Sequence, residues 1–484
     1  MNEYFDKMND DDIKILSEIE RFTFENELWD RGETVIAAVS GGKDSVFMLM
    51  VLRELSKMQG FDLRAVHINH LLRGKESDGD EIFVAELCRK WKIPLKIYRV
   101  NIAELSEKFH LGIEETARNQ RLRIFDEISK EYDGVVALAH TADDVVETFL
   151  FNLLRGTGIR GLSAMEPKKN RMVRPILPIW REQIVSVLRR RNIFWREDSS
   201  NLDLKYSRNL IRNELIPFIK SHFGKNSIYH IESASQMIRE TKYALERCFK
   251  IQYDKIFVGE CKNIVVFRAD ETLTDPFTFG EMLRQTLIRF GIGLKQFSRE
   301  RIEKIFNSLK TARADKKITI YSGIFAVKIE NCLFFADHLP IQLVSKNIGL
   351  DEQIALDDDL GKIQVEITHP PENFAEISPL EAYLGYDWRE ISIKPYRSGM
   401  FFKPLGNVSM RLSKFLKNRG VPSIFRRSLP LIFIGKELAW VGGVEISEQF
   451  KITENTKDVI HIKWSGNFPE ILLKSIRGCS EAIK

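Results

Sequence analysis

The sequence predicts an α/β protein, in which a parallel-sheet domain is followed by two smaller α+β modules. A chain of 484 residues is too long for one hydrophobic core, so several domains are expected. Up to about residue 223, short apolar runs alternate with amphipathic stretches, and beyond that point helical patterns are followed by strand patterns. The hydrophobic share of 44% is ample for packed cores.

The first domain, over residues 1–223, is predicted from four strand patterns and four helix patterns that alternate. The strands are expected at 35–39, 63–68, 95–100 and 135–139, and the helices at 46–58, 80–91, 114–128 and 145–155. Such alternation predicts a parallel sheet covered on both faces. Ligands of these sheets bind at the carboxyl ends of the strands, and the main motifs of this chain follow a strand.

The rest of the chain divides into smaller predicted parts. Residues 224–340 are expected to form an α+β domain, with helices at 232–250, 277–290 and 299–309 and a hairpin of strands at 317–321 and 324–329. Residues 341–387 are predicted to be a linker with some strand character. A third module is expected at 388–466, followed by a tail at 467–484.

Composition narrows the class of protein. The net charge of +5 is mildly basic and only weakly indicates a polyanionic partner. The acidic N-terminus lacks the apolar core of a signal peptide and no apolar stretch is long enough to span a membrane, so a cytoplasmic location without membrane contact is expected. The five cysteines include no Cys-x-x-Cys pair, and no zinc pattern is found.

The most informative motif is Ser-Gly-Gly-Lys-Asp-Ser at Ser40–Ser45, between a strand pattern and a helix pattern. Adjacent glycines allow a concave turn whose N–H groups point inward, and the following helix aims its positive end at the same place. Asp44 can add a magnesium ligand. The loop therefore predicts a nucleotide triphosphate site, and it is neither a Walker A nor a dinucleotide-binding pattern.

The second motif is Ala-His-Thr-Ala-Asp-Asp-Val-Val-Glu-Thr, at residues 139–148 after the fourth strand. Asp144 and Glu147 are three residues apart and share one helix face. Acidic residues also favour the first turn of any helix, but that explanation covers one carboxylate better than three beside His140. Two carboxylates on one face suit an ammonium group or a metal.

Other segments are weaker signals. His67 and His70 end a strand pattern and could border an adenine, whereas Arg118 belongs to what is otherwise an ordinary solvated helix. A basic run at 410–429 contains no acidic residue and interleaves Phe415 and Phe425 with its cations, which favours contact with phosphates over a merely solvated face. Two shorter basic clusters lie at 168–171 and 189–191.

The loop at residues 40–45 resembles the PP-loop of the N-type ATP pyrophosphatases. Taken in order, the motifs resemble those of the tRNA(Ile)-lysidine synthetase family: the loop, the segments 65–73 and 112–121, the run 139–165, Arg-Pro-Ile-Leu at 174–177, and the stretch 197–209. Leu-Leu-Arg-Gly-Thr-Gly at 153–158 and Glu-Asp-Ser-Ser-Asn at 197–201 are specific to that family. The segment 397–406 resembles its C-terminal domain, except that Met400 stands where the family usually has Asp.

The resemblance implies a reaction. The family uses ATP to join free L-lysine to the 2-position of the wobble cytidine, position 34, of the isoleucine tRNA with a CAU anticodon. An adenylated cytidine is the intermediate, and AMP and diphosphate are released. The product lysidine changes codon specificity from AUG to AUA and amino-acid identity from Met to Ile. The implied partners are this tRNA, lysine and ATP with Mg²⁺, and the chain could act as a homodimer.

The resemblance also implies roles for residues of this chain. Asp44, Arg118 and Asp144 are the expected catalytic residues, and Asp44 is the expected metal ligand. Asp144 and Glu147 are expected to bind lysine. The expected ATP-binding residues are Ser40, Gly41, Gly42, Lys43, Asp44, Ser45, His67 and His140. The expected tRNA-binding residues are Arg208, Arg212, Arg411, Lys414, Lys417 and Arg426.

Three alternative functions fit the sequence less well. A PP-loop tRNA 2-thiolation enzyme would need a cysteine pair or iron–sulfur ligands, which the cysteine spacing does not supply. A small-molecule synthetase such as GMP synthetase would not need the basic C-terminal module. A tRNA-binding protein without catalysis is disfavoured by the complete loop and by the acidic pair.

Overall fold

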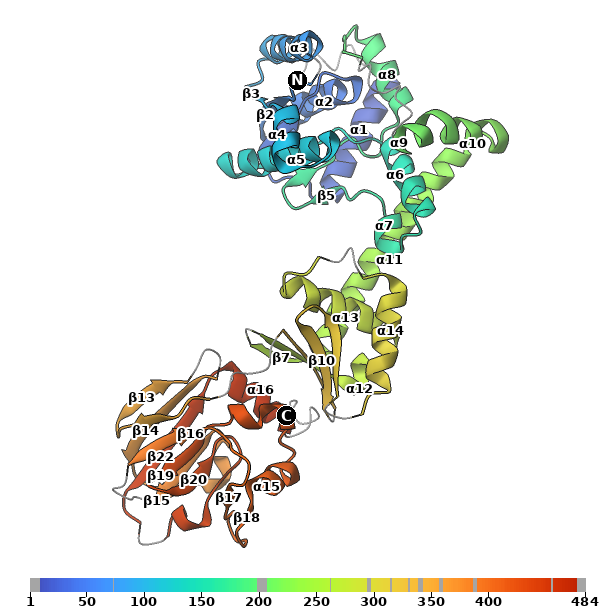
Figure 1. The fold of residues 1–484 in the computed structure, drawn as a ribbon. Helices are drawn as coiled ribbons and strands as arrows, with labels where there is room; N and C mark the ends of the chain where they lie inside the picture. The colour runs from blue at the N-terminus through green and yellow to red at the C-terminus, as the bar shows by residue number, and fades with distance from the viewer. Residues whose placement is uncertain are drawn as a thin grey trace. The chain divides into compact units, whose positions relative to one another are not determined.

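The computed structural model describes residues 9–476, apart from 73, 198–206, 262, 294–296, 314–315, 330, 338–342, 357–359, 386–389 and 454–455. Most of the resembling stretch 197–209 therefore lies outside the described residues. The chain forms two compact units, residues 1–245 and 246–484 (Figure 1). The predicted domain boundaries at 223 and 340 stay predictions.

The first unit is built on a six-stranded sheet. Its order is β3-β2-β1-β4-β6-β5, and every neighbouring pair is parallel except β5 with β6. The strands are β1 (Thr34–Ala38), β2 (Asp62–Asn69), β3 (Leu95–Arg99), β4 (Val135–Ala137), β5 (Lys168–Lys169) and β6 (Met172–Val173). The four predicted strands are thus confirmed as β1 to β4, and the predicted parallel sheet is confirmed with them.

Both faces of this sheet are buried, which explains why its strands are continuous apolar runs. Val35 and Ala37 of β1 belong to one core with the helices α1, α2 and α8, whereas Ile36 between them faces a second core with Phe125 and Ile128 of α5. Successive side chains of a strand point to opposite faces, so one strand serves both cores.

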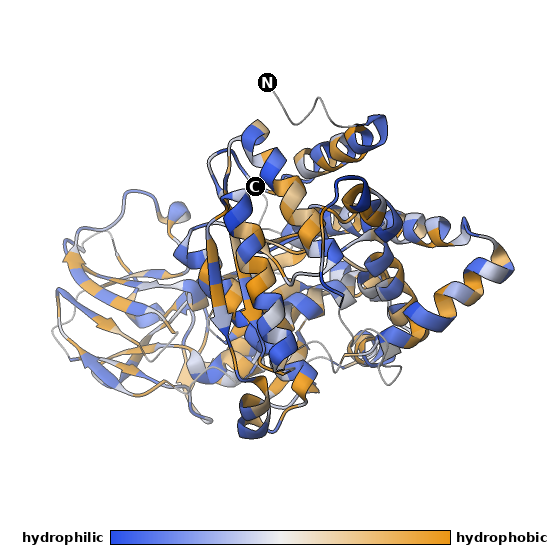
Figure 2. Cartoon of the chain, turned by 90° about the horizontal axis from the view of Figure 1, so that it is seen from above, coloured by the Kyte–Doolittle hydropathy of each residue, from blue (hydrophilic) through white to orange (hydrophobic). Residues whose placement is uncertain are grey.

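The helices of this unit are α1 (Asp10–Glu25), α2 (Lys43–Gln59), α3 (Lys75–Trp91), α4 (Ile102–Phe109), α5 (Ile113–Glu131), α6 (Ala142–Leu154), α7 (Ile159–Leu162), α8 (Arg181–Arg190), α9 (Ser207–Leu210) and α10 (Ile216–Phe223). The four predicted helices are confirmed as α2, α3, α5 and α6, and the others lie outside the four predicted ranges. A π-helical turn joins α9 to α10 at Ile211–Leu215, and α11 (Ser227–Ile256) runs on into the second unit. Figure 2 shows helices banded with hydrophilic and hydrophobic residues, as expected for helices that cover a core.

The second unit begins with an antiparallel sheet of order β7-β8-β11-β10-β9. Helices α13 and α14 pack on one face of it together with the end of α11, as Phe279 and Phe306 show. The predicted hairpin is confirmed as β9 and β10. The elements are β7 (Phe257–Cys261), β8 (Ile264–Arg268), α12 (Ala269–Thr272), α13 (Pro276–Arg289), α14 (Arg299–Lys310), β9 (Lys317–Tyr321), β10 (Ile324–Ile329) and β11 (Cys332–Ala336).

Two further sheets complete this unit, with orders β12-β16-β19-β20-β21 and β13-β14-β22-β15, beside the short hairpin β17-β18. The strands are β12 (Lys346–Ile348), β13 (Glu352–Ala355), β14 (Lys362–Thr368), β15 (Glu381–Gly385), β16 (Ile391–Lys394), β17 (Phe401–Phe402), β18 (Met410–Arg411), β19 (Leu431–Ile434), β20 (Glu437–Val441), β21 (Glu445–Ile446) and β22 (Val459–Ser465). The helices are α15 (Leu412–Asn418) and α16 (Asn467–Ile476).

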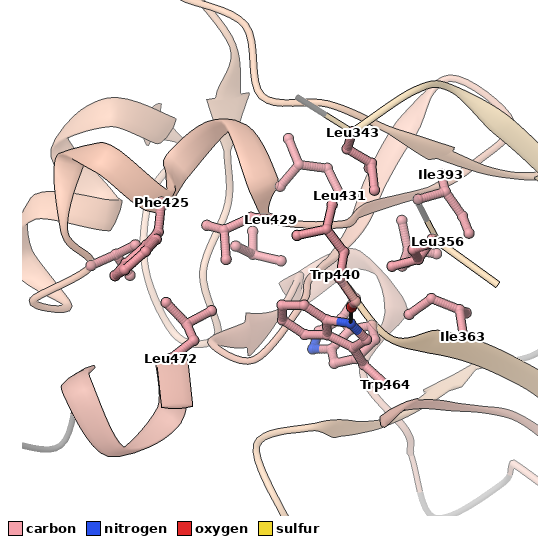
Figure 3. Packing of buried hydrophobic residues seen from close by; sticks show 14 of the residues in the cluster. Leu343, Leu356, Ile363, Ile393, Phe425, Leu429, Leu431, Trp440, Trp464 and Leu472 are labelled. Atoms are coloured by element: carbon pink, nitrogen blue, oxygen red, sulfur yellow. Dashed lines mark hydrogen bonds between the residues drawn. The ribbon is translucent and has the colours of Figure 1, made fainter. Parts of the chain in front are cut away.

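The stretch 341–387, predicted as a linker with some strand character, contributes four of these strands. β12 pairs with β16, and both β14 and β15 pair with β22, so the stretch lies within the C-terminal sheets. The reason is burial: Ile363 and Val365 of β14 join Trp440 and Trp464 in one core (Figure 3). The strand character visible in the sequence is therefore a better guide than the linker interpretation.

Candidate active site

The two principal motifs meet because of the strand order. β1 leads to β2 and β3 on one side of the sheet, and the chain then returns to place β4 on the other side of β1. This reversal opens a crevice at the carboxyl ends of β1 and β4. The loop Ser40–Ser45 leaves β1 there and the segment His140–Thr148 leaves β4 there, so α2 and α6 both begin at the crevice.

The loop Ser40–Ser45 presents the N-terminus of α2. The first backbone bond of this helix runs from the Val46 N–H to the Gly42 carbonyl at 3.0 Å, so the N–H groups of residues 43–45 precede the helical ladder. Ser45 shapes the loop from within: its Oγ accepts from the N–H groups of Ser40 and Gly41, both at 3.2 Å, and donates to the Gly42 carbonyl. An anion is therefore best received at the helix start.

Gly41 is required for its backbone conformation. Its φ is +95°, in the left-handed region that L side chains rarely adopt. A Cβ at Gly41 would point toward Phe83 and Val84 at 3.5 Å rather than into the phosphate space, and a Cβ at Gly42 would meet only the Ser40 Oγ at 3.6 Å. The two glycines thus have different roles, although the sequence pattern treats them alike.

Arg181 joins the two motifs. Its guanidinium donates from Nε to Asp44 at 3.3 Å, from one terminal nitrogen to Glu147 at 2.7 Å and from the other to Asp144 at 2.5 Å. The backbone N–H of Arg181 also donates to Asp143 at 2.8 Å. Three carboxylates that follow two strand ends therefore share one partly buried cation.

Arg212 is the second cation of this cluster. It lies in the π-helical turn and donates to both oxygens of Glu147, at 2.7 and 2.8 Å. Glu147 is 3% exposed and lies between two arginines. Arg212 is therefore part of the acidic cluster, and its predicted contact with tRNA stays a prediction; π-turns are common at functional sites.

The carboxylate oxygens can be accounted for one by one. Asp144 uses one oxygen for Arg181 and the other for the N–H and hydroxyl of Thr141, both at 2.9 Å. Both Glu147 oxygens face arginines. Asp44 differs, because its Oδ1 is buried without a hydrogen-bond partner among the described residues while its Oδ2 faces Arg181.

The titration behaviour of the two aspartates reflects this difference. Burial, with the nearby Asp144 carboxylate, raises the pKa of Asp44, and the cations Arg181 and Lys43 offset this effect only in part. Burial also acts to raise the pKa of Asp144, but Arg181, His140 and Thr141 together hold that pKa below its usual value. Asp144 is therefore a firmly ionised, structured carboxylate, and Asp44 keeps one oxygen for a further ligand.

A cavity of about 1040 Å³ lies beside this cluster. Its wall includes Ser40, Ser45, His67, His70, His140 and Arg118, and further cations from several elements, namely Arg121, Arg160, Lys169, Arg174 and Arg208. Among its lining residues, Asp80 and Glu166 are the carboxylates. The pKa of Arg121 is lowered, mainly by desolvation and also by repulsion from Arg118 and Arg208, as expected where cations lie close together. The cavity is suited to a polyanion.

The three histidines of the cavity are not equivalent. The Nδ1 of His67 lies 2.8 Å from the Val39 carbonyl, whereas the Nδ1 atoms of His70 and His140 are buried without a partner among the described residues. Burial lowers the pKa of His70 and that of His140 to about 4. Both rings are thus neutral near pH 7, with one nitrogen available to a ligand.

The residues of the second unit that were predicted to bind tRNA differ in how exposed they are. Arg411, Lys414 and Lys417 are exposed on β18 and α15, whereas the Nε of Arg426 is buried. Phe415 and Phe425 are 3% and 1% exposed, so these rings belong to the hydrophobic core and cannot stack on bases. The interleaving of these rings with the cations is therefore no sign of phosphate contact, because their spacing serves packing, and contact of the basic run with phosphates stays a prediction.

Three arginines of the basic clusters of the first unit are paired with carboxylates of the protein. Arg190 and Arg191 pair with Asp12, which is 4% exposed, and Arg171 pairs with Asp133 at 2.9 Å. Arg190 and Arg191 hold the end of α8 to α1, which a count of charges along the sequence does not reveal.

Sequence reasoning missed Arg181. A signal was present: Arg181 is the first residue of α8, where the helix dipole disfavours a cation. An arginine at such a position indicates a specific anionic partner.

Arg208, which was predicted to bind tRNA, lines the cavity and donates to the Thr148 hydroxyl at 3.3 Å.

Comparisons with protein families match two parts of the chain. A family model described as a PP-loop domain matches residues 13–219, and one described as the TilS substrate C-terminal domain matches residues 391–464. In the part of the chain that the structure describes, no helix is both long and apolar enough to cross a membrane.

Individual proteins are similar over nearly the whole chain. A tRNA(Ile)-lysidine synthase from Clostridium perfringens is 30% identical over 465 residues, which cover 92% of this chain and 98% of that protein. One from Clostridium tetani is 30% identical, covering 93% of this chain and 98% of that protein. Among solved structures, the U34-tRNA thiolase NcsA from Methanococcus maripaludis is 20% identical with a TM-score of 0.40, covering 47% of this chain and 79% of that chain.

Proposed function

This chain belongs to the tRNA(Ile)-lysidine synthase family, and from that premise we propose that its ATP-dependent formation of lysidine takes place where α2 and α6 begin. Lysine, ATP and tRNA(Ile) are the substrates that this membership implies. The observation that carries the placement is the junction of the PP-loop with the acidic helix start beside a large cationic cavity.

The reaction divides into two displacements. In the first, the 2-oxo oxygen of cytosine 34 bonds to the α-phosphorus of ATP while the bond to the leaving diphosphate breaks. In the second, the ε-amine of lysine gives up a proton and bonds to C2 of the cytosine while the C2–O bond to AMP breaks. The chain's main task is to position the reactants and to neutralise charge.

The phosphates are bound at the start of α2. The N–H groups of residues 43–45, the Ser40 hydroxyl and the Lys43 ammonium are the donors, and His67 and His140 border the nucleotide. Mg²⁺ fits this site through the Asp44 Oδ1, because that oxygen is buried and without a protein partner. When bound, Mg²⁺ would neutralise phosphate charge.

Arg118 stabilises the charge that develops on the α-phosphate. Its support is its place in the wall of the cavity, on the same side as Arg121 and Arg208. The expected consequence is that Arg118→Ala slows formation of the adenylated tRNA more than it weakens tRNA binding. Pyrophosphate release with tRNA and ATP alone measures the former, and normal release with weak tRNA binding would place Arg118 on the RNA surface.

Asp144 and Glu147 form the lysine site together with their arginines. The two carboxylates are already balanced by Arg181 and Arg212, so lysine meets a cluster with little net charge rather than a bare acidic pair. Asp144→Ala should raise the lysine requirement and leave pyrophosphate release intact. The opposite pattern would assign Asp144 to the ATP site.

The tRNA body is held by exposed cations of the C-terminal module, Arg411, Lys414 and Lys417, with Arg426 beside them. Arg208 and Arg212 lie at the catalytic end, where the wobble nucleotide must enter. A homodimer and a cytoplasmic location remain predictions of the sequence, which sedimentation and cell fractionation would test.

One assay tests the function as a whole. The full chain is incubated with ATP, Mg²⁺, labelled lysine and tRNA, and acid-precipitable label is measured. We expect label on tRNA(Ile) with a CAU anticodon and none when its wobble cytidine is replaced by uridine. Label on neither tRNA, with an intact preparation, would overturn the assignment, and sulfur transfer to tRNA would support the thiolation alternative.

A further inference from the structure

Arg181 occupies an unusual position at the junction of the two motifs. Its side chain is 18% exposed, and each of its three guanidinium nitrogens donates to a different carboxylate: Asp44 at 3.3 Å, Glu147 at 2.7 Å and Asp144 at 2.5 Å. Asp44 comes from the helix after β1, whereas the other two come from the helix after β4. Arg181 therefore contacts both the nucleotide side and the lysine side of the site.

A purely structural role for this guanidinium is the first alternative. Helix α8 is already attached without it, because Ile184, Val187 and Leu188 are buried in the main core of the first unit. The N-terminus of α8 is fixed by the Arg181 backbone N–H on Asp143 and by the Trp180 backbone N–H, which donates to the Gln183 side chain at 2.8 Å. Its C-terminus is fixed by two arginines on Asp12. The guanidinium is not needed to hold the helix.

The first turn of α8 is also an unfavourable position for a cation, unless anionic partners stabilise it there. The first turn of a helix carries the positive end of the helix dipole, which disfavours arginine. Burial adds a desolvation cost that only well-placed anions offset. Three carboxylates within reach of one guanidinium would repel one another without it, so the cation and the acidic groups depend on each other.

We propose that Arg181 is a positioning residue shared by both half-reactions. It holds Asp44 so that its Oδ1 stays turned away from the cluster and available on the nucleotide side. It also fixes Asp144 and Glu147 in the arrangement that receives lysine. The inference rests on the lysidine-forming reaction proposed above, and it links two steps that the sequence motifs treat separately.

The role predicts a combined defect that other variants do not show. Arg118→Ala is expected to affect adenylation, and Asp144→Ala to affect lysine use. Arg181→Ala should reduce both: the rate of pyrophosphate release with tRNA and ATP alone should fall by about tenfold or more, and the lysine KM of the complete reaction should rise by a similar factor. Arg181→Lys keeps the charge but lacks the fork of donors, so it should restore only part of either activity.

Rescue by guanidinium ion separates positioning from a general loss of structure. Guanidinium added at concentrations that leave the wild-type enzyme unaffected should restore both half-reactions of Arg181→Ala, with the same half-saturating concentration, because one site serves both. Arg189→Ala is the matched control: Arg189 is an exposed arginine of the same helix, and its replacement should change neither activity nor rescue. Thermal unfolding of each variant verifies that it is folded.

Two results would overturn the inference. The first is an Arg181→Ala enzyme in which only one half-reaction falls. The second is rescue that differs in concentration dependence between the two half-reactions, or is absent from both. If the alanine variant does not fold, the two half-reactions are compared in Arg181→Lys and Arg181→Gln instead.

The wild-type enzyme distinguishes failure of the proposed function from failure of this inference. If the wild type forms no lysidine, the proposed function is contradicted and there is no defect to assign to Arg181.

Discussion

The cations of the two units are used in different ways. In the first unit, Arg181 and Arg212 are held by carboxylates of the candidate active site, and Arg190 and Arg191 by the buried Asp12. In the second unit, Lys414 and Lys417 are exposed on α15. Both regions look basic in the sequence.

The difference teaches that burial decides what a basic run can do. A guanidinium with buried carboxylate partners has fixed donors and little charge left for a distant polyanion, whereas an exposed ammonium keeps its counterions until a phosphate replaces them. Substitutions in the first group should therefore change activity or stability. Substitutions in the second should change the salt dependence of tRNA binding.

Asp44→Asn should have the largest effect and test the active-site half of the comparison. It keeps the shape of the side chain but removes the charge that faces Arg181 and the nucleotide. We expect pyrophosphate release to fall by about a hundredfold or more, roughly 2.7 kcal/mol of transition-state stabilisation. Unchanged release would remove Asp44 from the site, and Asp126→Asn on the exposed side of α5 is the matched control.

Asp12→Ala should lower the free energy of unfolding by about 2–3 kcal/mol, because it leaves two partly buried arginines without their carboxylate. Urea unfolding measures this. The salt dependence of tRNA binding should stay as in the wild type. A shallower salt dependence in Arg190→Ala would show that this arginine contacts RNA, and would break the proposed contrast between the units.

His140 gives a prediction for pH. Its pKa is about 4 in the folded chain and near 6.5 in an unfolded one, so below pH 6.5 the unfolded chain binds the extra proton. The stability that comes from keeping His140 neutral is fully present above pH 6.5 and is lost as the pH falls toward 4. At pH 5 the loss amounts to about 2 kcal/mol. His140→Gln should lose less unfolding free energy between pH 7 and 5 than the wild type. The exposed His230→Gln should behave like the wild type.

Single alanine substitutions of Arg411, Lys414 and Lys417 should have the smallest effects. Each should make the slope of log affinity against log salt shallower by about one unit and weaken tRNA binding only several-fold, while lysine and ATP use stay unchanged. Arg299→Ala, an exposed arginine paired with Glu303, serves as the control. Unchanged slopes in all three variants would make this run a solvated face.

Local pattern was enough for much of the fold. Strands β1 to β4, helices α2, α3, α5 and α6 and the hairpin β9-β10 follow from periodicity and turn residues, because both are set by neighbours in the sequence. The stretch 341–387 was harder, since its strands pair with β16 and β22, whose partners cannot be identified from short-range pattern.

By itself, the sequence determined the PP-loop, the acidic helix start after β4, the family and hence the reaction. Only the tertiary structure decided how these parts are connected. It gave Gly41 its left-handed backbone, turned Phe415 and Phe425 into the core, and placed Arg181 among three carboxylates. The physical reason is that burial and ion pairing depend on residues far apart in the chain: Arg181 and Asp44 are separated by 137 positions and meet through the strand order alone.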